Sequence, residues 1–318
     1  MEKEILKTIK YFSFFNYAPT FEEIYTFIGK KTSKKALQEE LERLSDIKVI
    51  IQFSINRHYN LIRYTLPQYS VKQTQMSNVK CQISKNKLEN GRFKFYIKLL
   101  SIFPQIRLVG LSGSISMFNA QKNDDIDLFI ITAKNRLFTG RFIALILAQI
   151  LGLRRERNIF QSSKLQATCY VLRVTSDKVC LNLFFDECNL AVPAFKKTSY
   201  VAHEILQMKP IINKDQVYEK FLIANKWVLE YFPNSARLIS NIKYQNAKLH
   251  LKNQNYLLFL QCIFDILFLI FNFFPNLVEK INKKIQISLI NKHQTNEIIS
   301  STQLWFHPDD FGKKIRDI

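Results

Sequence analysis

Three helical patterns open the chain. Apolar residues recur at helical spacing from Glu4 to Phe15. Thr20 is placed to cap a second helix, with Glu23 three residues later as its capping-box partner. Ser33 is placed to cap a third helix that continues to Leu44. We therefore expect three helices at the start of the chain.

Two strand patterns follow these helices. Lys48–Phe53 and Tyr59–Tyr64 are rich in β-branched and aromatic residues and are expected to join around Asn56-Arg57. Three helices and a two-stranded wing resemble a winged helix-turn-helix domain, which we place at residues 1–66. Such domains bind DNA or serve as packing and dimerisation modules. The third helix mixes bases with acids, which favours packing and leaves DNA binding open: Lys34, Lys35, Arg43, Glu39, Glu40 and Glu42.

The rest of the chain divides into three parts. Residues 67–92 are polar and are expected as a linker or a solvated helix. A core domain is expected over residues 93–190, and a helical region over residues 191–318. Helices in that region are expected at Tyr200–Met208 and Gln216–Phe232, each ending shortly before a proline. The fold class that these patterns predict is α+β.

The most informative stretch of the core is Val109–Thr132. Ile106–Leu111 has the pattern of a short apolar strand, which breaks at Ser112-Gly113-Ser114. Ile115–Ala120 can then start a helix. A second apolar run, Ile126–Ile131, follows a polar cluster and predicts another strand.

The acidic residues at this second strand suggest metal chemistry. Asp125 and Asp127 would share one face, because successive side chains of a strand point to opposite faces. Same-face neighbours lie about 6.5 Å apart at the backbone, and their carboxylates can converge on two metal ions about 3.5–4 Å apart. Gly113 lets backbone approach a ligand, and a turn that opens a helix offers N–H groups and the Ser114 hydroxyl to a phosphate. The pattern predicts phosphoryl or nucleotidyl transfer.

A Gly-Ser pair, a gap of this length and an Asp-x-Asp flanked by apolar residues resemble the signature of the nucleotidyltransferase fold. Polymerase beta, the tRNA CCA-adding enzymes and antibiotic nucleotidyltransferases share this fold. The resemblance covers residues 105–187 and implies a mixed sheet, a nucleoside triphosphate as substrate and Mg²⁺ or Mn²⁺ as cofactor. By the same resemblance, Gly113 and Ser114 would hold the triphosphate, and Asp125 and Asp127 would hold the metal.

That family usually adds a third carboxylate from a later strand. The best later strand here is Val179–Phe185, and its centre holds Asn182. An amide can coordinate a metal through its carbonyl oxygen, but it carries no charge and cannot act as a base. Asp186 and Glu187 at the end of the strand are substitutes. Either two acids carry the chemistry, or the fold is a nucleotide-binding relic.

Two motifs lie further along the chain. His203-Glu204 could touch an acceptor hydroxyl, but we favour a satisfied polar patch at a helix interface. Together with the winged-helix-like start and the core motif, the Phe306-His307-Pro308-Asp309 segment resembles uncharacterised bacterial nucleotidyltransferase-domain proteins. For His307 and Asp309 a turn or helix cap is expected.

Composition constrains partners and location. The formal net charge of +20 favours polyanions such as nucleic acid, nucleotides or an anionic membrane surface, and both RNA and protein remain open as acceptors. The 5 cysteines are odd in number and lack paired-ligand spacing, which argues against a disulfide frame or a zinc site. No signal-peptide core opens the chain, so a cytoplasmic location is expected.

One segment indicates membrane contact. Tyr256–Phe274 is nineteen residues long, is interrupted only by Gln261, Asp265 and Asn272, and has the length to span a bilayer. A central aspartate costs about 2.5–3.5 kcal/mol on insertion, which offsets much of the gain from the apolar residues. A buried or membrane-surface helix is favoured, and spanning remains open.

The predicted function is transfer of a nucleoside monophosphate from a nucleoside triphosphate to an unidentified hydroxyl acceptor. Two alternatives remain. One is a catalytically inactive nucleotide-binding sensor coupled to the winged-helix-like domain, which Asn182 supports. The other is a membrane-attached interaction protein built around residues 256–274.

Overall fold

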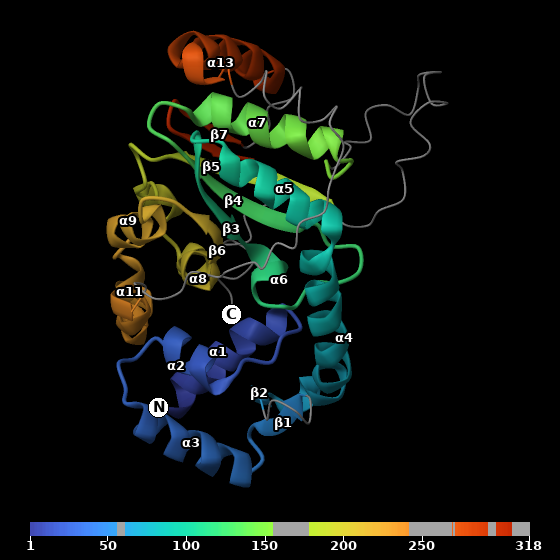
Figure 1. The fold of residues 1–318 in the computed structure, drawn as a ribbon. Coiled ribbons are helices and arrows are strands. Elements are labelled where there is room, and N and C mark those ends of the chain that lie inside the picture. Colours follow the sequence, from blue (N-terminus) through green and yellow to red (C-terminus); the bar gives the residue numbers. More distant parts are fainter. Residues whose placement is uncertain (56–60, 155–177, 242–268, 270, 292–296, 307–318) are drawn as a thin grey trace.

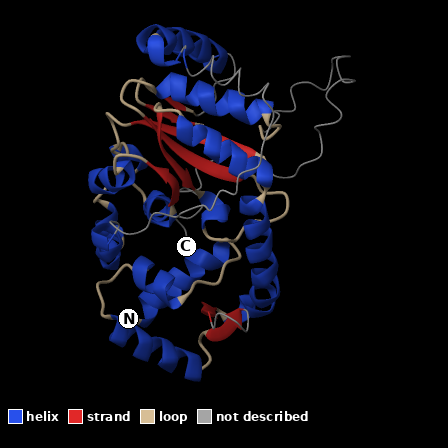
Figure 2. Cartoon of the chain, viewed as in Figure 1, coloured by secondary structure: helices blue, strands red, loops and turns tan. Residues whose placement is uncertain are grey.

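The computed structural model describes residues 1–55, 61–154, 178–241, 269, 271–291 and 297–306. Within these residues the chain has α+β architecture with a mixed sheet (Figures 1 and 2). The predicted fold class is confirmed at this level.

The first 66 residues contain the helices and strands that their pattern predicts. The elements are α1 (Glu2–Phe14), α2 (Phe21–Phe27), α3 (Lys34–Asp46), and the antiparallel pair β1 (Ile51–Ile55) and β2 (Leu61–Thr65). The capping box is present, because Thr20 and Glu23 each accept a hydrogen bond from the other's N–H. Ser33 caps α3 by accepting from the N–H of Ala36.

Residues 67–92, expected as a linker or a solvated helix, are mainly helical. A short 3-10 helix, η1 (Pro67–Tyr69), leads into α4 (Ser70–Glu89), and Asn90 then caps α5 (Gly91–Ile102). The helix α4 is not solvated on all sides, because Lys80, Ser84 and Lys87 are buried. In Figure 1 it runs along one side of the molecule, from the β1–β2 hairpin to α5.

The core is a 6-stranded sheet in the order β6-β3-β4-β5-β8-β7. Its strands are β3 (Ile106–Leu111), β4 (Ile126–Thr132), β5 (Val179–Asp186), β6 (Lys209–Asn213), β7 (Ile298–Ile299) and β8 (Gln303–Trp305). β4 and β5 are parallel, and the other neighbouring pairs are antiparallel. The three strands predicted in the core domain are confirmed and lie together in the sheet.

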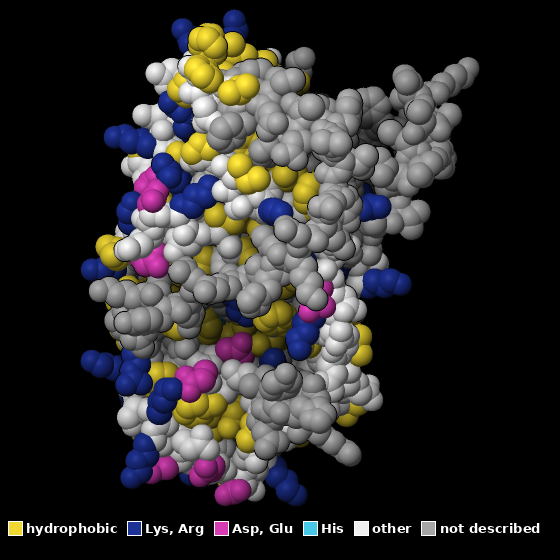
Figure 3. Space-filling view, viewed as in Figure 1, with side chains coloured by type: hydrophobic (Ala, Val, Ile, Leu, Met, Phe, Trp, Pro, Cys, Tyr) yellow, Lys and Arg dark blue, Asp and Glu magenta, His cyan; other side chains and the backbone are white. Residues whose placement is uncertain are grey.

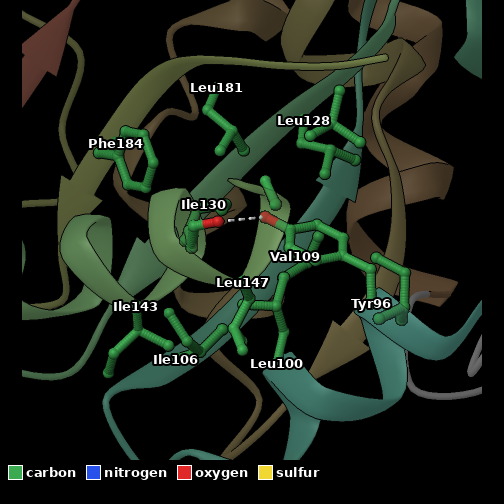
Figure 4. Packing of buried hydrophobic residues seen from close by; sticks show 14 of the residues in the cluster. Tyr96, Leu100, Ile106, Val109, Leu128, Ile130, Ile143, Leu147, Leu181 and Phe184 are labelled. Carbon is green, nitrogen blue, oxygen red and sulfur yellow. Dashed lines mark hydrogen bonds between the residues drawn. The ribbon is translucent and has the colours of Figure 1, made fainter. Parts of the chain in front are cut away.

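Helices cover both faces of this sheet. On one face lie α5 and α7 (Leu137–Ile150), and α13 (Pro275–Asn291) packs on α7 (Figure 1). The core beneath them joins Tyr96 and Leu100 of α5 and Ile143 and Leu147 of α7 to strand residues such as Val109 and Ile130 (Figure 4). On the other face, α1, α8 (Ser199–Gln207) and α9 (Val217–Ala224) pack against the sheet in one hydrophobic cluster.

The region 191–318 is not purely helical, contrary to our prediction. It supplies β6, β7 and β8, and these strands of 5, 2 and 3 residues are too short for alternation to reveal them. Its smaller elements are η4 (Ala194–Lys196), α10 (Val228–Tyr231), η5 (Pro233–Ser235) and α11 (Ala236–Asn241).

The helix predicted at Gln216–Phe232 is divided into α9 and α10. The break falls at Asn225, which is fully buried. Its side-chain amide donates to the carbonyls of Leu190 and Phe221, and its Oδ1 accepts from the N–H of Val192. An asparagine that bonds to backbone groups in this way competes with helix continuation.

The N-terminal helices share packing with the rest of the molecule. Tyr11, Phe12 and Phe27 belong to the hydrophobic cluster that also contains α8 and α9. Asn234 donates to the carbonyls of Tyr25 and Lys30 and accepts from the N–H of Thr32. Residues 1–66 are therefore joined to the core by both apolar and hydrogen-bonded contacts.

Candidate functional site

The candidate site begins at the turn after β3. Gly113 has φ +59°, in the left-handed region that glycine adopts without steric cost, and opens the one-turn helix α6 (Gly113–Ser116). A Cβ at this position would lie 2.6 Å from Asp127 Oδ2. The preceding residue, Ser112, donates its N–H to the carbonyl of Asp127 at 3.0 Å. The turn can lie against Asp127 only because residue 113 is glycine.

The two predicted acids lie where β4 begins. Asp127 is the second residue of the strand, and Asp125 immediately precedes the strand. Burial raises the pKa of Asp127 to about 7, although a hydrogen bond from Cys180 opposes this shift. The nearby carboxylates of Glu204 and Asp125 raise it further. Negative charge at Asp127 is therefore costly when no cation is bound.

Ser114 lies on the turn but its hydroxyl is engaged locally. Its Oγ donates to Asp124 Oδ2 at 3.1 Å, and the same oxygen accepts from the N–H of Gln121 at 2.8 Å. The hydroxyl would have to rotate away from Asp124 to reach a phosphate. The structure thus brings Gly113 to Asp127 and binds Ser114 to the loop that precedes Asp125.

Helix α4 holds that loop in place. Lys87 Nζ donates to the carbonyls of Lys122 and Asp124, both at 2.9 Å. Lys80 Nζ donates to Asn119 Oδ1 at 3.0 Å, and Ser84 Oγ accepts from the N–H of Ala120 at 3.0 Å. Buried amines can satisfy several loop carbonyls at once, so these contacts fix the path of the chain into Asp125.

Asn182 lies on β5 beside the acids. Cys180 is the register partner of Asp127, and Asn182 is two residues further along the same face of that strand. The amide of Asn182 donates to Cys180 Sγ at 2.7 Å. The strand position from which a third acid was expected therefore presents an amide, and that amide is directed to a thiol.

Asp186 lies at the other end of β4 and β5. Its register partner is Thr132, about 16 Å along the strand from Asp127. Its carboxylate accepts from the N–H groups of Arg136 and Cys188, at 3.1 and 2.9 Å. The structure does not bring Asp186 to the acidic pair, and its carboxylate instead orders the turns that follow the two strands.

Glu204, for which we favoured a polar patch at a helix interface, lies at this site. It projects from α8, and one oxygen, Oε2, accepts from Ser112 Oγ at 2.9 Å and from the N–H of Gly113 at 3.3 Å. Burial raises its pKa, and these two donors partly counter the shift. An acid among the apolar residues Ala202, Ile205 and Leu206 is the signal that could have revealed it.

His203 lies at a helix interface, but in an aromatic cluster rather than in the polar patch that we favoured for the His203-Glu204 pair. Its ring stacks on Tyr11 at 3.8 Å and on Phe27 at 4.3 Å between centroids. Burial holds its pKa well below the usual value, so the ring is neutral at pH 7. His203 therefore joins α8 to the N-terminal helices, while its neighbour Glu204 faces the turn.

The two carboxylates of the site suit a metal ion that is also bound by the phosphates of a nucleotide. Mg²⁺ prefers oxygen ligands and commonly takes one or two carboxylates together with substrate phosphates and water. Asp125 and Asp127 can supply those carboxylates. Among the described residues, no group of three or more His, Cys, Asp or Glu side chains is placed to hold a metal.

Three predicted features lie wholly or mainly outside the described residues. These are the turn around Asn56-Arg57, the pair His307 and Asp309, and residues 256–268 and 270 of the apolar segment. At the end of that segment Phe271 is buried, whereas Phe273 and Phe274 are exposed. No helix in the described part of the chain is long and apolar enough to cross a membrane.

Comparison of the chain with protein-family models, with curated proteins and with solved structures finds no match in any of the three.

Proposed function

We propose that this chain is a metal-dependent nucleotidyltransferase with a nucleotidyltransferase-fold core. It would transfer a nucleoside monophosphate from a nucleoside triphosphate to a hydroxyl acceptor. The observation that carries the proposal is the fit of Gly113 against Asp127, where a Cβ would lie 2.6 Å from the carboxylate. An anion-binding turn and a metal-binding acid are thereby held together, which nucleotidyl transfer requires.

The residues would divide the work as follows. The N–H groups of the Gly113 turn and the Ser114 hydroxyl orient the triphosphate. Asp125 and Asp127 hold Mg²⁺ or Mn²⁺, which supplies charge neutralisation at the α-phosphate. The acceptor hydroxyl attacks in line, and pyrophosphate leaves. The rate enhancement comes mainly from positioning and electrostatics.

Glu204 would compete with the triphosphate, because it already accepts a hydrogen bond from the N–H of Gly113. Its Oε2 accepts from the N–H of Gly113 at 3.3 Å. A phosphate at the turn would displace that carboxylate, and Ser112 Oγ would be released with it. Nucleotide binding would then move a side chain of α8.

The test uses purified protein, Mg²⁺ or Mn²⁺, each of the four α-labelled nucleoside triphosphates, and total cellular RNA and protein as acceptors. We expect label transfer by the native chain and by Asp46→Ala, an exposed control. The double variant Asp125→Ala/Asp127→Ala should lose transfer by at least ~10³-fold, since catalysis depends on both acids. If the double variant transferred label as well as the native chain, the proposal would be wrong.

A nucleotide sensor is the second candidate, and two observations favour it. Asn182 stands where a third acid was expected, and its amide is directed to Cys180. Glu204 links the turn to α8, whose His203 stacks on Tyr11 of α1. Nucleotide occupancy could thereby be communicated to the N-terminal helices. Saturable nucleotide binding without pyrophosphate release in the same assay would support the sensor.

For residues 1–66 we propose a packing role on a winged-helix-like fold. Every base on α3 is near an acid: Lys34 pairs with Glu22, Lys35 with Glu39, and Arg43 with Glu2 and Glu40. Such pairing reduces the positive potential that a DNA backbone would meet. The contacts of Tyr11 and Phe27 with His203 show the packing that the role requires.

A further inference from the structure

The helix α13 buries polar residues and exposes apolar ones, the reverse of an ordinary surface helix. Its buried residues include the polar Asn282 and Gln286, whereas four large apolar residues are exposed at intervals of four along it. Those residues are Leu277, Ile281, Ile285 and Leu289, with exposed fractions of 57%, 49%, 53% and 57%. We call them the α13 ridge. Residues four apart on a helix are neighbours, so they form one continuous apolar stripe.

Polar contacts fix the orientation of this helix. Glu279 accepts from the N–H groups of Phe138 and Thr139 at the start of α7, at 2.9 and 2.8 Å. Gln286 donates to the carbonyl of Phe138 at 2.7 Å and accepts from Arg141 at 2.7 Å. Rotating α13 to bury its ridge would break all of these contacts. The outward direction of the ridge is therefore built into the fold.

The exposed apolar surface extends beyond the ridge. Phe273 and Phe274, immediately before α13, are 72% and 62% exposed. Figure 3 shows hydrophobic side chains gathered over α13 at the top of the view, with basic side chains beside them. Contiguous exposed apolar patches on a protein mark interaction sites.

Charge identifies the kind of partner. Lys280 and Lys284 are exposed on the same helix beside the ridge, whereas Lys283 Nζ lies over the Phe138 ring of α7 at 5.9 Å from its centroid. The only acid on the helix, Glu279, is bonded to α7. A helix with an apolar stripe and lysines beside it suits the boundary between acyl chains and anionic headgroups. A second copy of the chain is a poorer fit, because a two-fold contact through the ridge would bring both sets of lysines together.

We propose that α13 binds the surface of an anionic lipid bilayer, with the ridge inserted among the headgroups and the lysines at the lipid phosphates. The catalytic proposal is independent of this one. Arg136 contacts Asn276 at the start of α13 and lies just after the Thr132 end of β4. Asp127 lies at the opposite end of that strand, so the acidic site would remain away from the membrane.

The test is co-sedimentation of the full chain with vesicles of phosphatidylcholine containing 30 mol% phosphatidylglycerol, beside vesicles of phosphatidylcholine alone. We expect binding to the anionic vesicles at low salt. The variant Leu277→Gln/Ile281→Gln/Ile285→Gln/Leu289→Gln should weaken it at least tenfold. Lys280→Gln/Lys284→Gln should lose the preference for anionic vesicles. Phe195→Gln/Ile223→Gln, which alters exposed apolar residues elsewhere, should bind as the native chain does.

Two further measurements on the same variants distinguish lipid binding from the alternative roles of the ridge. Sedimentation velocity tests for self-association, and thermal unfolding tests for packing within the chain. A ridge variant that turns a dimer into a monomer while native vesicle binding is absent would assign the ridge to self-association and overturn the proposal. A ridge variant that binds vesicles normally but unfolds at lower temperature would assign it to packing within the chain. That outcome would overturn the proposal as well.

Discussion

At the scale of single residues, the site depends on Gly113, which has no Cβ. Gly113 lets the turn approach Asp127, and the N–H of Gly113 is already bonded to Glu204. Two partly buried carboxylates thus flank one glycine. Their mutual repulsion is a cost that the free protein bears and that a cation would relieve.

The first prediction concerns Gly113→Ala. The new Cβ would collide with Asp127 Oδ2 at 2.6 Å. The alanine would also have to adopt the left-handed backbone conformation of Gly113, which is unfavourable for residues with a Cβ. We expect loss of label transfer by more than about tenfold and a fall of about 2 kcal/mol in the free energy of unfolding. Transfer assays and chemical denaturation measure the two effects.

Gly152→Ala is the matched control, because Gly152 has φ +66° but a Cβ there would meet nothing within 4 Å. Its free energy of unfolding should fall by about 1 kcal/mol, because alanine disfavours the left-handed backbone, and label transfer should be unchanged. Equal losses of transfer in both variants would mean that the contact with Asp127 has no role.

Single residues also show how far the sequence predicts the site. Gly113 and Asp127 lie within fifteen positions of each other, so local strand and turn patterns were sufficient to predict that they meet. Glu204 is remote in sequence from the turn and meets it because α8 leads into β6, which pairs with β3. No local spacing could have indicated that contact, although a lone acid in an apolar helix was a sign of it.

At the scale of elements, α4 acts as a brace for the loop that carries the acids. Its pattern suggested a solvated helix or a linker, because lysines and amides dominate it. The structure buries Lys80 and Lys87 against loop oxygens instead. A buried amine and an exposed amine are indistinguishable in the sequence, since both occur on polar helices. The helix break at Asn225 was missed for a similar reason, because its cause is a set of tertiary hydrogen bonds.

The second prediction concerns this brace. Lys87→Met keeps the aliphatic stem but leaves the carbonyls of Lys122 and Asp124 without their donor. We expect the free energy of unfolding to fall by about 2–3 kcal/mol and amide exchange over residues 119–125 to accelerate. Lys72→Met, an exposed change on the same helix, should change the free energy of unfolding by less than about 0.5 kcal/mol. It should leave amide exchange over residues 119–125 unchanged. Unchanged exchange in Lys87→Met would show that the loop is held by other contacts.

At the scale of the whole molecule, the N-terminal helices and the core form one packed body. The aromatic cluster around His203 contains rings from α1 and α2, and Asn234 bonds to α2 and to the segment that joins α2 and α3. A boundary at residue 66 is visible in the sequence pattern. The packing that crosses it depends on side chains nearly two hundred positions apart.

The third prediction tests that packing. Asn234→Ala removes three hydrogen bonds between η5 and residues 25–32. We expect the free energy of unfolding to fall by about 2–3 kcal/mol, because two carbonyls and one N–H lose a partner. The transition should remain single when followed by circular dichroism and tryptophan fluorescence. Asn78→Ala, an exposed control on α4, should have little effect, and two separate transitions in the native chain would contradict a single packed body.

The order of strands in the sheet also bears on how the protein is made. β6 forms one edge, and β8 pairs with one side of β5, to which Thr302 and Phe306 add backbone hydrogen bonds. While the ribosome is still translating the segment between α11 and β8, β5 has one side of its backbone unpaired. The Phe184 and Phe185 side chains beside it have not yet met Leu304 and Trp305. Until residues 303–305 have been synthesised, that side of β5 is open to pairing with a strand of another chain.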